Sequence, residues 1–350
     1  MKNIEIEKLV RSNILKLKPY SSARDEYKGE YGIFLDANEN PFNIPYNRYP
    51  DPLQLKVKEK ISKIKHIGIE NIFLGNGSDE AIDLSIRIFC NPGKDNIVAI
   101  EPTYGMYKVC SDINDVEYRP VLLKENFDLD THTILNTTDK NTKLIFICSP
   151  NNPTGNSFSE TDILYILENF NGILVLDEAY IDFSEKESLI KYTKDYNNLI
   201  ILQTFSKAWG MAGIRLGMAF SNQLIISLFN KVKYPYNINI LTLETASKAL
   251  ENTIQVKEWI NKLINERNRI IKEIQKYHFV EKVYPSDANF ILVKVKNADD
   301  LYNFLINKRV IVRNRSKIPL CNNCLRFTVG TEEENKILLK NLSEYNQLNY

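Results

Sequence analysis

The chain has 350 residues, of which 43% are hydrophobic, and 45 lysines and arginines face 44 aspartates and glutamates for a net charge of +1. Such a chain can form one large domain or a large and a small one, and it has no global field that would attract nucleic acid or an anionic membrane. The first residues lack the apolar core of a signal peptide, and no segment approaches the ~18 apolar residues of a membrane span. We therefore expect a cytoplasmic protein that binds neither nucleic acid nor membrane.

The cysteines and histidines do not indicate a metal centre. The five cysteines are odd in number and scattered, which is typical of reduced thiols in a cytosolic protein. Cys321 and Cys324 form a single CxxC without a second ligand pair, so we interpret them as incidental. His66, His132 and His278 are isolated from one another. The sequence thus predicts no bound metal.

Between about residues 53 and 250, short apolar runs alternate with helical patterns. The strand-like runs are 96–102, 143–150, 172–180 and 199–207. They are rich in Ile, Val and Leu, and each ends in polar residues. Near-continuous apolar runs fit strands buried on both faces of a mainly parallel sheet covered by helices. Ligands of such sheets bind beyond the carboxyl ends of the strands.

A second pattern follows a long helical stretch at 241–278. It runs as strand 289–295, helix 298–309, strands 310–315 and 324–330, and helix 331–345. Thr331 and Glu334, after Gly330, form a capping box that predicts the start of the last helix. This order of elements is typical of a smaller α+β domain.

Three consecutive strand ends in the first pattern carry polar groups of complementary type. "SPNNPTG" ends with a rigid turn that presents Asn152, the next run supplies Asp177 and Tyr180, and the third supplies Ser206 and Lys207. Each residue alone has an ordinary explanation: a common turn, a nucleotide-binding carboxylate, a solvated lysine. Together they match pyridoxal 5′-phosphate, because an amine can condense with its aldehyde, a carboxylate can pair with its pyridinium nitrogen, and donors can hold the ring oxygen.

A nucleotide-binding Rossmann domain is the alternative from another class. It would interpret "GNGSDE" and "VLDEAY" as phosphate contacts and ribose or metal contacts. The chain lacks a full G-x-G-x-x-G, and this alternative leaves Lys207, Asn152 and Arg326 without a role. A pyridoxal-phosphate-binding regulator is disfavoured because no segment remains for a DNA-reading domain.

The segments "SPNNPTG", "VLDEAY", "TFSKAWGMAGIRLG" and "LRFTVGT" resemble those of the fold-type I pyridoxal-phosphate aminotransferases. "LKPYSSAR", "LDANENP", "NRYPDP", "GNGSDE" and "EPTYGMY" are similar to segments of the branch that acts on histidinol phosphate. The resemblance covers nearly the whole chain. It implies an α/β fold with a large domain, whose mainly parallel seven-stranded sheet lies between helices, and a smaller α+β domain.

The resemblance also implies roles for single residues around the cofactor ring. Lys207 would be the Schiff-base lysine and Asp177 the partner of the pyridinium nitrogen. Asn152 and Tyr180 would hold the phenolic oxygen, and Asn152 would also contact the substrate. Tyr104 would stack on the ring. Of these residues, Lys207, Asp177 and Tyr180 would be the catalytic ones.

A second implied group would hold the cofactor phosphate. Its members are the backbone amides of Gly77, Ser78 and Asp79 and the side chains of Thr204, Ser206 and Arg215. A helix start after Gly77 suits an anion, although Ser78 could instead be only an N-cap. Arg215 could be a surface ion-pair partner, but its position among glycines favours a close approach of the backbone to a ligand.

Further implied residues concern the substrate and a second subunit. Arg326 and Arg313 would hold the substrate's phosphate or the carboxylate of glutamate, with Tyr20 adding a hydroxyl. Arg315 shares the strand face of Arg313 and remains an alternative to it. Tyr49 would reach the cofactor site of the neighbouring subunit, which implies a homodimer.

The implied reaction moves an amino group between L-histidinol phosphate and 2-oxoglutarate, giving imidazole acetol phosphate and L-glutamate in histidine biosynthesis. The mechanism would be ping-pong, between pyridoxal phosphate and pyridoxamine phosphate. Lys207 would act as general base, which requires that the site lower its pKa from the ordinary ~10.4. Alternatives are an aminotransferase of aromatic amino acids or of another phosphorylated amine, and a phospho-amino-acid decarboxylase.

The expected organisation has three parts. Residues 1–45 would form a segment that packs with the small domain and the dimer interface, 46–250 the large cofactor-binding domain, and 251–350 the small one. A departure from the family lies at 42–46, where only "FNIPY" connects two motifs that the family often separates by more residues. Trp209 replaces a usual phenylalanine, and we expect it to serve packing.

Overall fold

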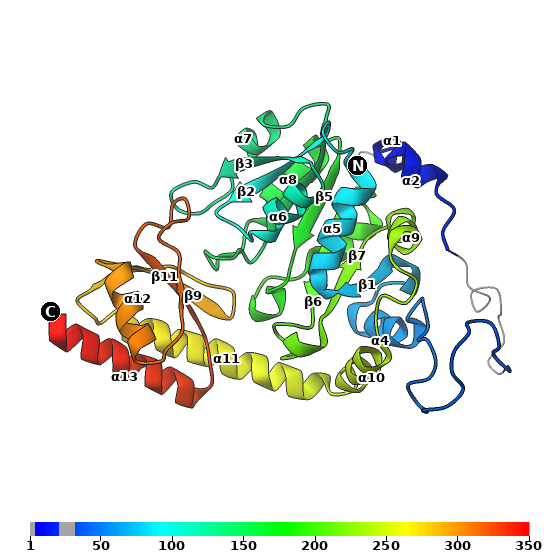
Figure 1. Ribbon diagram of the computed structural model, residues 1–350. Helices are drawn as coiled ribbons and strands as arrows, with labels where there is room; N and C mark the ends of the chain where they lie inside the picture. The colour runs from blue at the N-terminus through cyan, green and yellow to red at the C-terminus, as the bar shows by residue number, and fades with distance from the viewer. Residues whose placement is uncertain (1–3, 21–31, 350) are drawn as a thin grey trace.

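Two β-sheets organise the chain, whose computed structural model describes residues 4–20 and 32–349 (Figure 1). The strands of the large sheet are β1 (Ile72–Asn76), β2 (Asn96–Glu101), β3 (Glu117–Leu122), β4 (Thr142–Cys148), β5 (Ile173–Asp177), β6 (Leu199–Thr204) and β7 (Leu216–Phe220). They lie in the order β1-β7-β6-β5-β4-β2-β3, and only β7 runs antiparallel to its neighbours. The expected mainly parallel seven-stranded sheet is confirmed.

The runs predicted as strands at 96–102, 143–150, 172–180 and 199–207 correspond to β2, β4, β5 and β6. No pattern in the sequence predicts β1, β3 and β7. Edge strand β3 carries charged residues and a proline, and β1 and β7 are short and contain Gly75 and Gly217. None of the three therefore presents a continuous run of large apolar residues.

Alternate side chains of the large sheet enter two separate cores, which is why its central strands are apolar on both faces. In β4, for example, Phe146 packs on one side and Ile145 and Ile147 on the other. The helices on the Phe146 side are α1 (Ile6–Leu9), α2 (Ser12–Lys16), α5 (Gly77–Phe89), α6 (Met106–Ile113) and α9 (Gln223–Val232). Those on the other side are α4 (Leu55–Lys65), α7 (Thr131–Asn136), α8 (Glu160–Asn169) and α10 (Ile240–Ala249).

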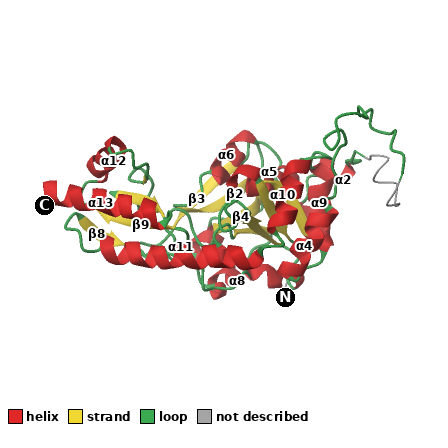
Figure 2. Cartoon of the chain, turned by 90° about the horizontal axis from the view of Figure 1, so that it is seen from below, coloured by secondary structure: helices red, strands yellow, loops and turns green. Residues whose placement is uncertain are grey.

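The small sheet has the order β10-β11-β9-β8 and is antiparallel throughout. Its strands are β8 (Val280–Val283), β9 (Phe290–Val295), β10 (Arg313–Asn314) and β11 (Cys324–Thr328). One face packs on α11 (Thr253–Ile274), α12 (Ala298–Asn307) and α13 (Glu332–Asn349). Helix α11 runs from the large sheet to the small one, with Val256 in a large-sheet core and Ile270 in the small-sheet core (Figure 2).

Three details of this second half bear on the predictions. The capping box is confirmed: Thr331 N donates to Glu334 Oε2 at 2.7 Å, and Glu334 N donates to Thr331 Oγ1 at 3.3 Å. The helix predicted at 241–278 is wrong as one element, because the chain breaks between α10 and α11. The strand predicted at 310–315 shrinks to β10, since Val310 N still bonds back to Leu305 O at the end of α12.

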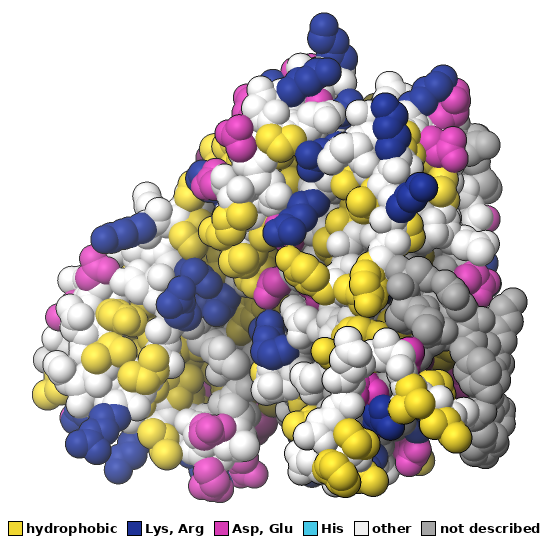
Figure 3. Space-filling model, turned by 45° about the vertical axis from the view of Figure 1, so that its right-hand side comes forward, with side chains coloured by type: hydrophobic (Ala, Val, Ile, Leu, Met, Phe, Trp, Pro, Cys, Tyr) yellow, Lys and Arg dark blue, Asp and Glu magenta, His cyan; other side chains and the backbone are white. Residues whose placement is uncertain are grey.

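The N-terminal part of the chain has two sections. Residues 4–17 lie on the helical layer of the large sheet rather than on the small domain, through Ile6, Val10 and Ile14. Residues 32–50, here called the arm, extend from the body of the molecule in two views (Figures 1 and 2). Hydrophobic side chains lie exposed on this side of the molecule (Figure 3). In the two described ranges, no helix has both the length and the apolarity for a membrane crossing.

A glycine fixes the close contact between β7 and the start of α5. A Cβ at Gly217 would lie 2.1 Å from the backbone nitrogen of Ser78, so a side chain cannot fit unless the two backbones separate. We expect Gly217→Ala to lower the free energy of unfolding by roughly 3 kcal/mol, measured by urea denaturation. Gly213→Ala is the matched control, because its Cβ would meet no atom within 4 Å. Equal stabilities of the two variants would contradict this account of the contact.

Candidate active site

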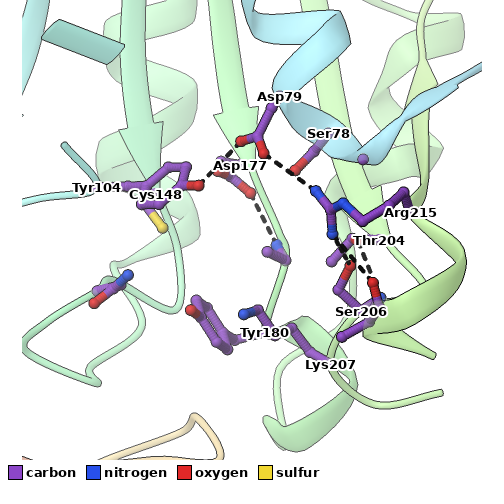
Figure 4. A pocket seen from close by; sticks show the side chains of 14 residues that line it. Ser78, Asp79, Tyr104, Cys148, Asp177, Tyr180, Thr204, Ser206, Lys207 and Arg215 are labelled. Carbon is purple, nitrogen blue, oxygen red and sulfur yellow. Dashed lines mark hydrogen bonds and ion pairs between the residues drawn. The ribbon is translucent and has the colours of Figure 1, made fainter. Parts of the chain in front are cut away.

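One pocket lies where the carboxyl ends of β4, β5 and β6 meet the start of α5 (Figure 4). Its lining residues are Gly77, Ser78, Asp79, Tyr104, Cys148, Asn152, Asp177, Ala179, Tyr180, Thr204, Ser206, Lys207, Ala212 and Arg215. Every residue predicted to hold the cofactor within its own chain is among them. Because parallel strands end at the same edge, residues up to 138 positions apart in sequence share one cavity.

Asp177 is the most deeply buried charge of the pocket, with a residue exposure of 2%. It ends β5, and its carboxylate accepts hydrogen bonds from Tyr107 Oη at 2.8 Å and Ala179 N at 3.0 Å. Burial raises the pKa of Asp177 to about 6, and these hydrogen bonds only partly oppose the shift. A cation beside this carboxylate would favour its charged form.

Tyr107 is a site residue that the sequence analysis missed. It lies on α6, is fully buried, and stacks on Phe146 with 4.9 Å between ring centroids. The signal was present in "EPTYGMY", which carries a second tyrosine three positions after Tyr104. Only Tyr104 was assigned from that segment. Cys148, Ala179 and Ala212 also line the pocket and were not predicted.

Lys207 follows β6, and its ammonium lies 5.6 Å from the centroid of the Tyr180 ring. Burial lowers the pKa of Lys207, and the positive charge of Arg326 adds to this effect, while Asp177 opposes it. A lysine with a lowered pKa has a larger uncharged fraction at neutral pH, as a nucleophile or general base requires. The pocket thus has the electrostatic property that the sequence analysis required of it.

The start of α5 and the turn before β7 form one corner of the pocket. Gly77 has φ +70°, and its N–H donates to Arg215 O at 2.8 Å. A Cβ on Gly77 would lie 2.7 Å from Arg215 Nη2, so glycine leaves room for the guanidinium. The alternative of Ser78 as an N-cap is wrong, because Asn76 holds that position, and its side chain makes no capping hydrogen bond.

Asp79 enters this corner by its side chain. Its carboxylate accepts from Tyr104 Oη at 3.0 Å and lies 3.5 Å from Arg215 Nη2 (Figure 4). Arg215 Nη1 also donates to Ser206 Oγ at 3.4 Å. The role predicted for Asp79 concerns only its backbone amide. The side chain links the predicted stacking residue to the predicted phosphate-binding arginine.

The small sheet brings arginines to the same side of the molecule. Arg326 donates to Asn152 Oδ1 and lies over the Phe290 ring, 5.1 Å from its centroid. Arg313 stands opposite Arg326 in the β10–β11 pairing and is exposed. Burial lowers the pKa of Arg315 to about 10, and the charges of Arg326 and Arg313 contribute. The structure therefore gathers the three guanidiniums and leaves both alternatives, Arg313 and Arg315, next to Arg326.

Arg313 and Arg326 are not among the residues that line the pocket, and two further predicted residues lie away from it. Tyr20 is 70% exposed and is not among the lining residues. Tyr49 is 51% exposed, and its ring stacks on Tyr236 with a centroid distance of 4.4 Å and an interplanar angle of 14°. If Tyr49 serves a cofactor site, that site belongs to another copy of the chain.

Comparisons with known proteins agree on a family. The model of the aminotransferase class I and II family matches residues 41–342. A histidinol-phosphate aminotransferase of Bacteroides thetaiotaomicron is 55% identical over 341 residues, which are 97% of this chain and 99% of that protein. Another, of Flavobacterium johnsoniae, is 51% identical over 349 residues, which are 99% of this chain and all of that protein.

Solved structures support the same fold. The histidinol-phosphate aminotransferase of Clostridium acetobutylicum has a TM-score of 0.80 at 26% identity, and the match covers 89% of this chain and 98% of that one. The enzyme of that name from Sinorhizobium meliloti, in complex with pyridoxal 5′-phosphate, has a TM-score of 0.79 at 22% identity, with 89% and 90% covered. At that identity the second match concerns the fold alone.

The raised pKa of Asp177 predicts a pH-dependent stability in the protein freed of cofactor. The folded chain binds this proton up to about pH 6, whereas the unfolded chain releases it near 3.8. The folded state therefore loses stability as the pH rises from about 4 to about 7, by on the order of 2–3 kcal/mol. Asp177→Asn abolishes this titration. In urea unfolding, the free energy of unfolding of the variant should therefore rise relative to that of the wild type as the pH increases between these values. A difference in free energy of unfolding that stays constant with pH would contradict the raised pKa of Asp177.

Proposed function

The chain belongs to the class I and II aminotransferases and, within them, to the histidinol-phosphate aminotransferases, and we propose that it exchanges an amino group between L-histidinol phosphate and 2-oxoglutarate. The products are imidazole acetol phosphate and L-glutamate. The observation that carries this proposal is the 55% identity over 97% of the chain. We propose the cytoplasm as the place of the reaction.

The pocket fits pyridoxal 5′-phosphate by the chemistry of its donors. Within the described part of the chain, the hydrogen-bond donors to the buried Asp177 carboxylate are neutral, so a protonated ring nitrogen would supply the missing positive charge. Gly77 leaves space beside Arg215 and the amides of the first turn of α5, which suits a phosphate. Bound there, the cofactor supplies an aldehyde for amine exchange and a ring that accepts electrons.

The residues of the chain then divide the work of the reaction. Lys207 Nζ would take the proton from Cα of the substrate and pass it to C4′, the aldehyde carbon of the cofactor; its lowered pKa favours the first of these two steps. Asn152 and Tyr180 orient the ring through its phenolic oxygen. Tyr104 covers a ring face, and Asp79 holds the phenol of Tyr104 from the side.

The arginines of the small sheet would bind the anionic end of both substrates. A guanidinium forms two parallel hydrogen bonds to a phosphate or a carboxylate, so one site can serve histidinol phosphate and 2-oxoglutarate in turn. We assign this role to Arg326 with Arg313, keep Arg315 as the alternative to Arg313, and keep Tyr20 as a further contact. Burial already lowers the pKa of Arg326, so an anion would compensate a guanidinium that is short of partners.

We propose a homodimer in which Tyr49 completes the partner's cofactor site. The arm exposes large apolar side chains, with Ile33 at 91% and Phe42 at 76% exposure, and a second copy would remove them from water. Tyr49 lies among them, half exposed, outside the pocket of its own chain. Both facts are accounted for if the arm crosses to the other subunit.

Relative turnover tests the substrate. With 2-oxoglutarate as acceptor, we expect kcat/KM for histidinol phosphate to exceed that for phenylalanine by about a hundredfold or more, because the carboxylate of phenylalanine is smaller and carries less charge than a phosphate and would leave part of the arginine group unpaired. Threonine phosphate is assayed in parallel for amino transfer and for released carbon dioxide. Absence of turnover of histidinol phosphate, or release of carbon dioxide as the main reaction, would reject the proposed function in favour of a sister enzyme.

Lys207 should be the covalent attachment point of the cofactor. We expect purified protein to be yellow, and borohydride to fix the cofactor to the peptide that contains Lys207, as mass spectrometry can establish. Lys207→Ala should lower kcat by more than about a thousandfold. Lys191→Ala is the control, because that lysine is exposed and pairs with Glu187 at 3.2 Å. Labelling of another lysine would contradict the assignment.

A further inference from the structure

The arm contains one charged side chain that is nearly buried, although its surroundings are exposed. The side chain of Glu39 is 4% exposed, whereas Ile33, Leu35 and Ile44 on the same arm are more than three quarters exposed. A carboxylate in such a position needs strong partners, because losing contact with water is costly. The motif that contains it, "LDANENP", has no task in the proposed function.

Glu39 has a separate partner for each carboxylate oxygen. Its Oε2 accepts from Arg48 Nη1 at 2.7 Å, and its Oε1 accepts from the backbone N–H of Tyr49 at 2.6 Å. Arg48 Nη1 also donates to Phe34 O at 3.1 Å. Glu39 thus ties the beginning of the arm to its end, directly at Tyr49.

These contacts determine how the chain leads into Tyr49. The carboxylate holds the backbone nitrogen of Tyr49 itself and the side chain of the preceding residue, so little freedom remains for the direction of the Tyr49 side chain. The ring then rests on Tyr236, almost parallel to it. Without the carboxylate, the arm from 39 to 49 would be a loop with few buried contacts, and such loops are mobile.

We propose that Glu39 is a positioning residue that presents Tyr49 to the cofactor site in the partner subunit. The inference rests on the proposed function, because it requires that Tyr49 act in the other subunit's site. It adds that a carboxylate of one chain controls cofactor binding in its partner while having little influence on the site of its own chain.

Hybrid dimers separate this role from a general effect on folding. One chain carries Lys207→Ala and the other Tyr49→Phe, so only one site of the hybrid has both Lys207 and Tyr49, which come from different chains. This hybrid should be active, whereas each parent homodimer is impaired. An inactive hybrid overturns the shared site and, with it, the role of Glu39.

The position of Glu39→Gln in the hybrid then decides. In the chain with Lys207→Ala, whose Tyr49 serves the working site, Glu39→Gln should lower hybrid activity by about tenfold, as expected for losing hydrogen bonds to a charged group. In the chain with Tyr49→Phe, the same substitution should leave the activity unchanged, and this placement is the matched control. Equal effects in both placements, or none in either, overturn the inference while the shared site stands.

Cofactor binding provides a readout that does not depend on turnover. In homodimers, Glu39→Gln should raise the dissociation constant of pyridoxal 5′-phosphate by about tenfold, and should have no further effect in a Tyr49→Phe background. Glu39→Asp keeps the charge but shortens its reach, so it should give a smaller effect with the same dependence on placement. Additive effects of Glu39→Gln and Tyr49→Phe would show that Glu39 does not act through Tyr49.

Discussion

A carboxylate buried at the end of β5 is the constraint on which the pocket depends. The charged form of Asp177 needs hydrogen bonds there, and one comes from the hydroxyl of Tyr107, a residue of α6 that packs against β4. The ring of Tyr107 is positioned by its contacts with the rings of Phe146 and Tyr104. Tyr104 in turn donates a hydrogen bond to Asp79 at the start of α5. The electrostatics of the site are therefore connected to the core of the large sheet, and the proposed cofactor would complete the set of charges.

The two sheets contribute different halves of the proposed chemistry, and one of their contacts is a turn beside the pocket. Gly155, with φ +84°, accepts a hydrogen bond from Asp287 N at 2.7 Å, and Ser286 leaves no room there for a Cβ. Beside this turn Arg326 bonds Asn152. Asn152, proposed to hold the cofactor ring, thus contacts Arg326, proposed to hold the substrate's anion. A movement of the small sheet would change the positions of both side chains.

Patterns in the sequence were sufficient for the parts of the molecule that have a simple environment. The central strands were predictable because both of their faces are buried, and the residues at their ends because parallel strands end together. Tyr107 was missed because a buried tyrosine on a helix looks like core, and its hydroxyl's partner lies 70 positions away. The break after Ala249 and the short β10 depend on how helices end against neighbours, which helical periodicity does not report. Arg313 and Arg315 share one face by the period of a strand, so the pattern alone could not choose between them.

Strand β7, the one antiparallel member of the large sheet, has a consequence for what can bind. It pairs with β6, and the Thr204–Gly217 pair closes a hairpin loop that contains Lys207 and Arg215. Both ends of this loop are therefore fixed by the sheet. In the proposed site, this loop would supply Lys207 for the aldehyde of the cofactor and, from its two ends, Ser206 and Arg215 for the phosphate. The spacing of Lys207 and Arg215 along this loop would then have to match the distance between the aldehyde and the phosphate of the cofactor. Insertions or deletions between residues 205 and 215 would change this spacing. The loop should therefore tolerate changes of length less well than its position outside the sheet suggests.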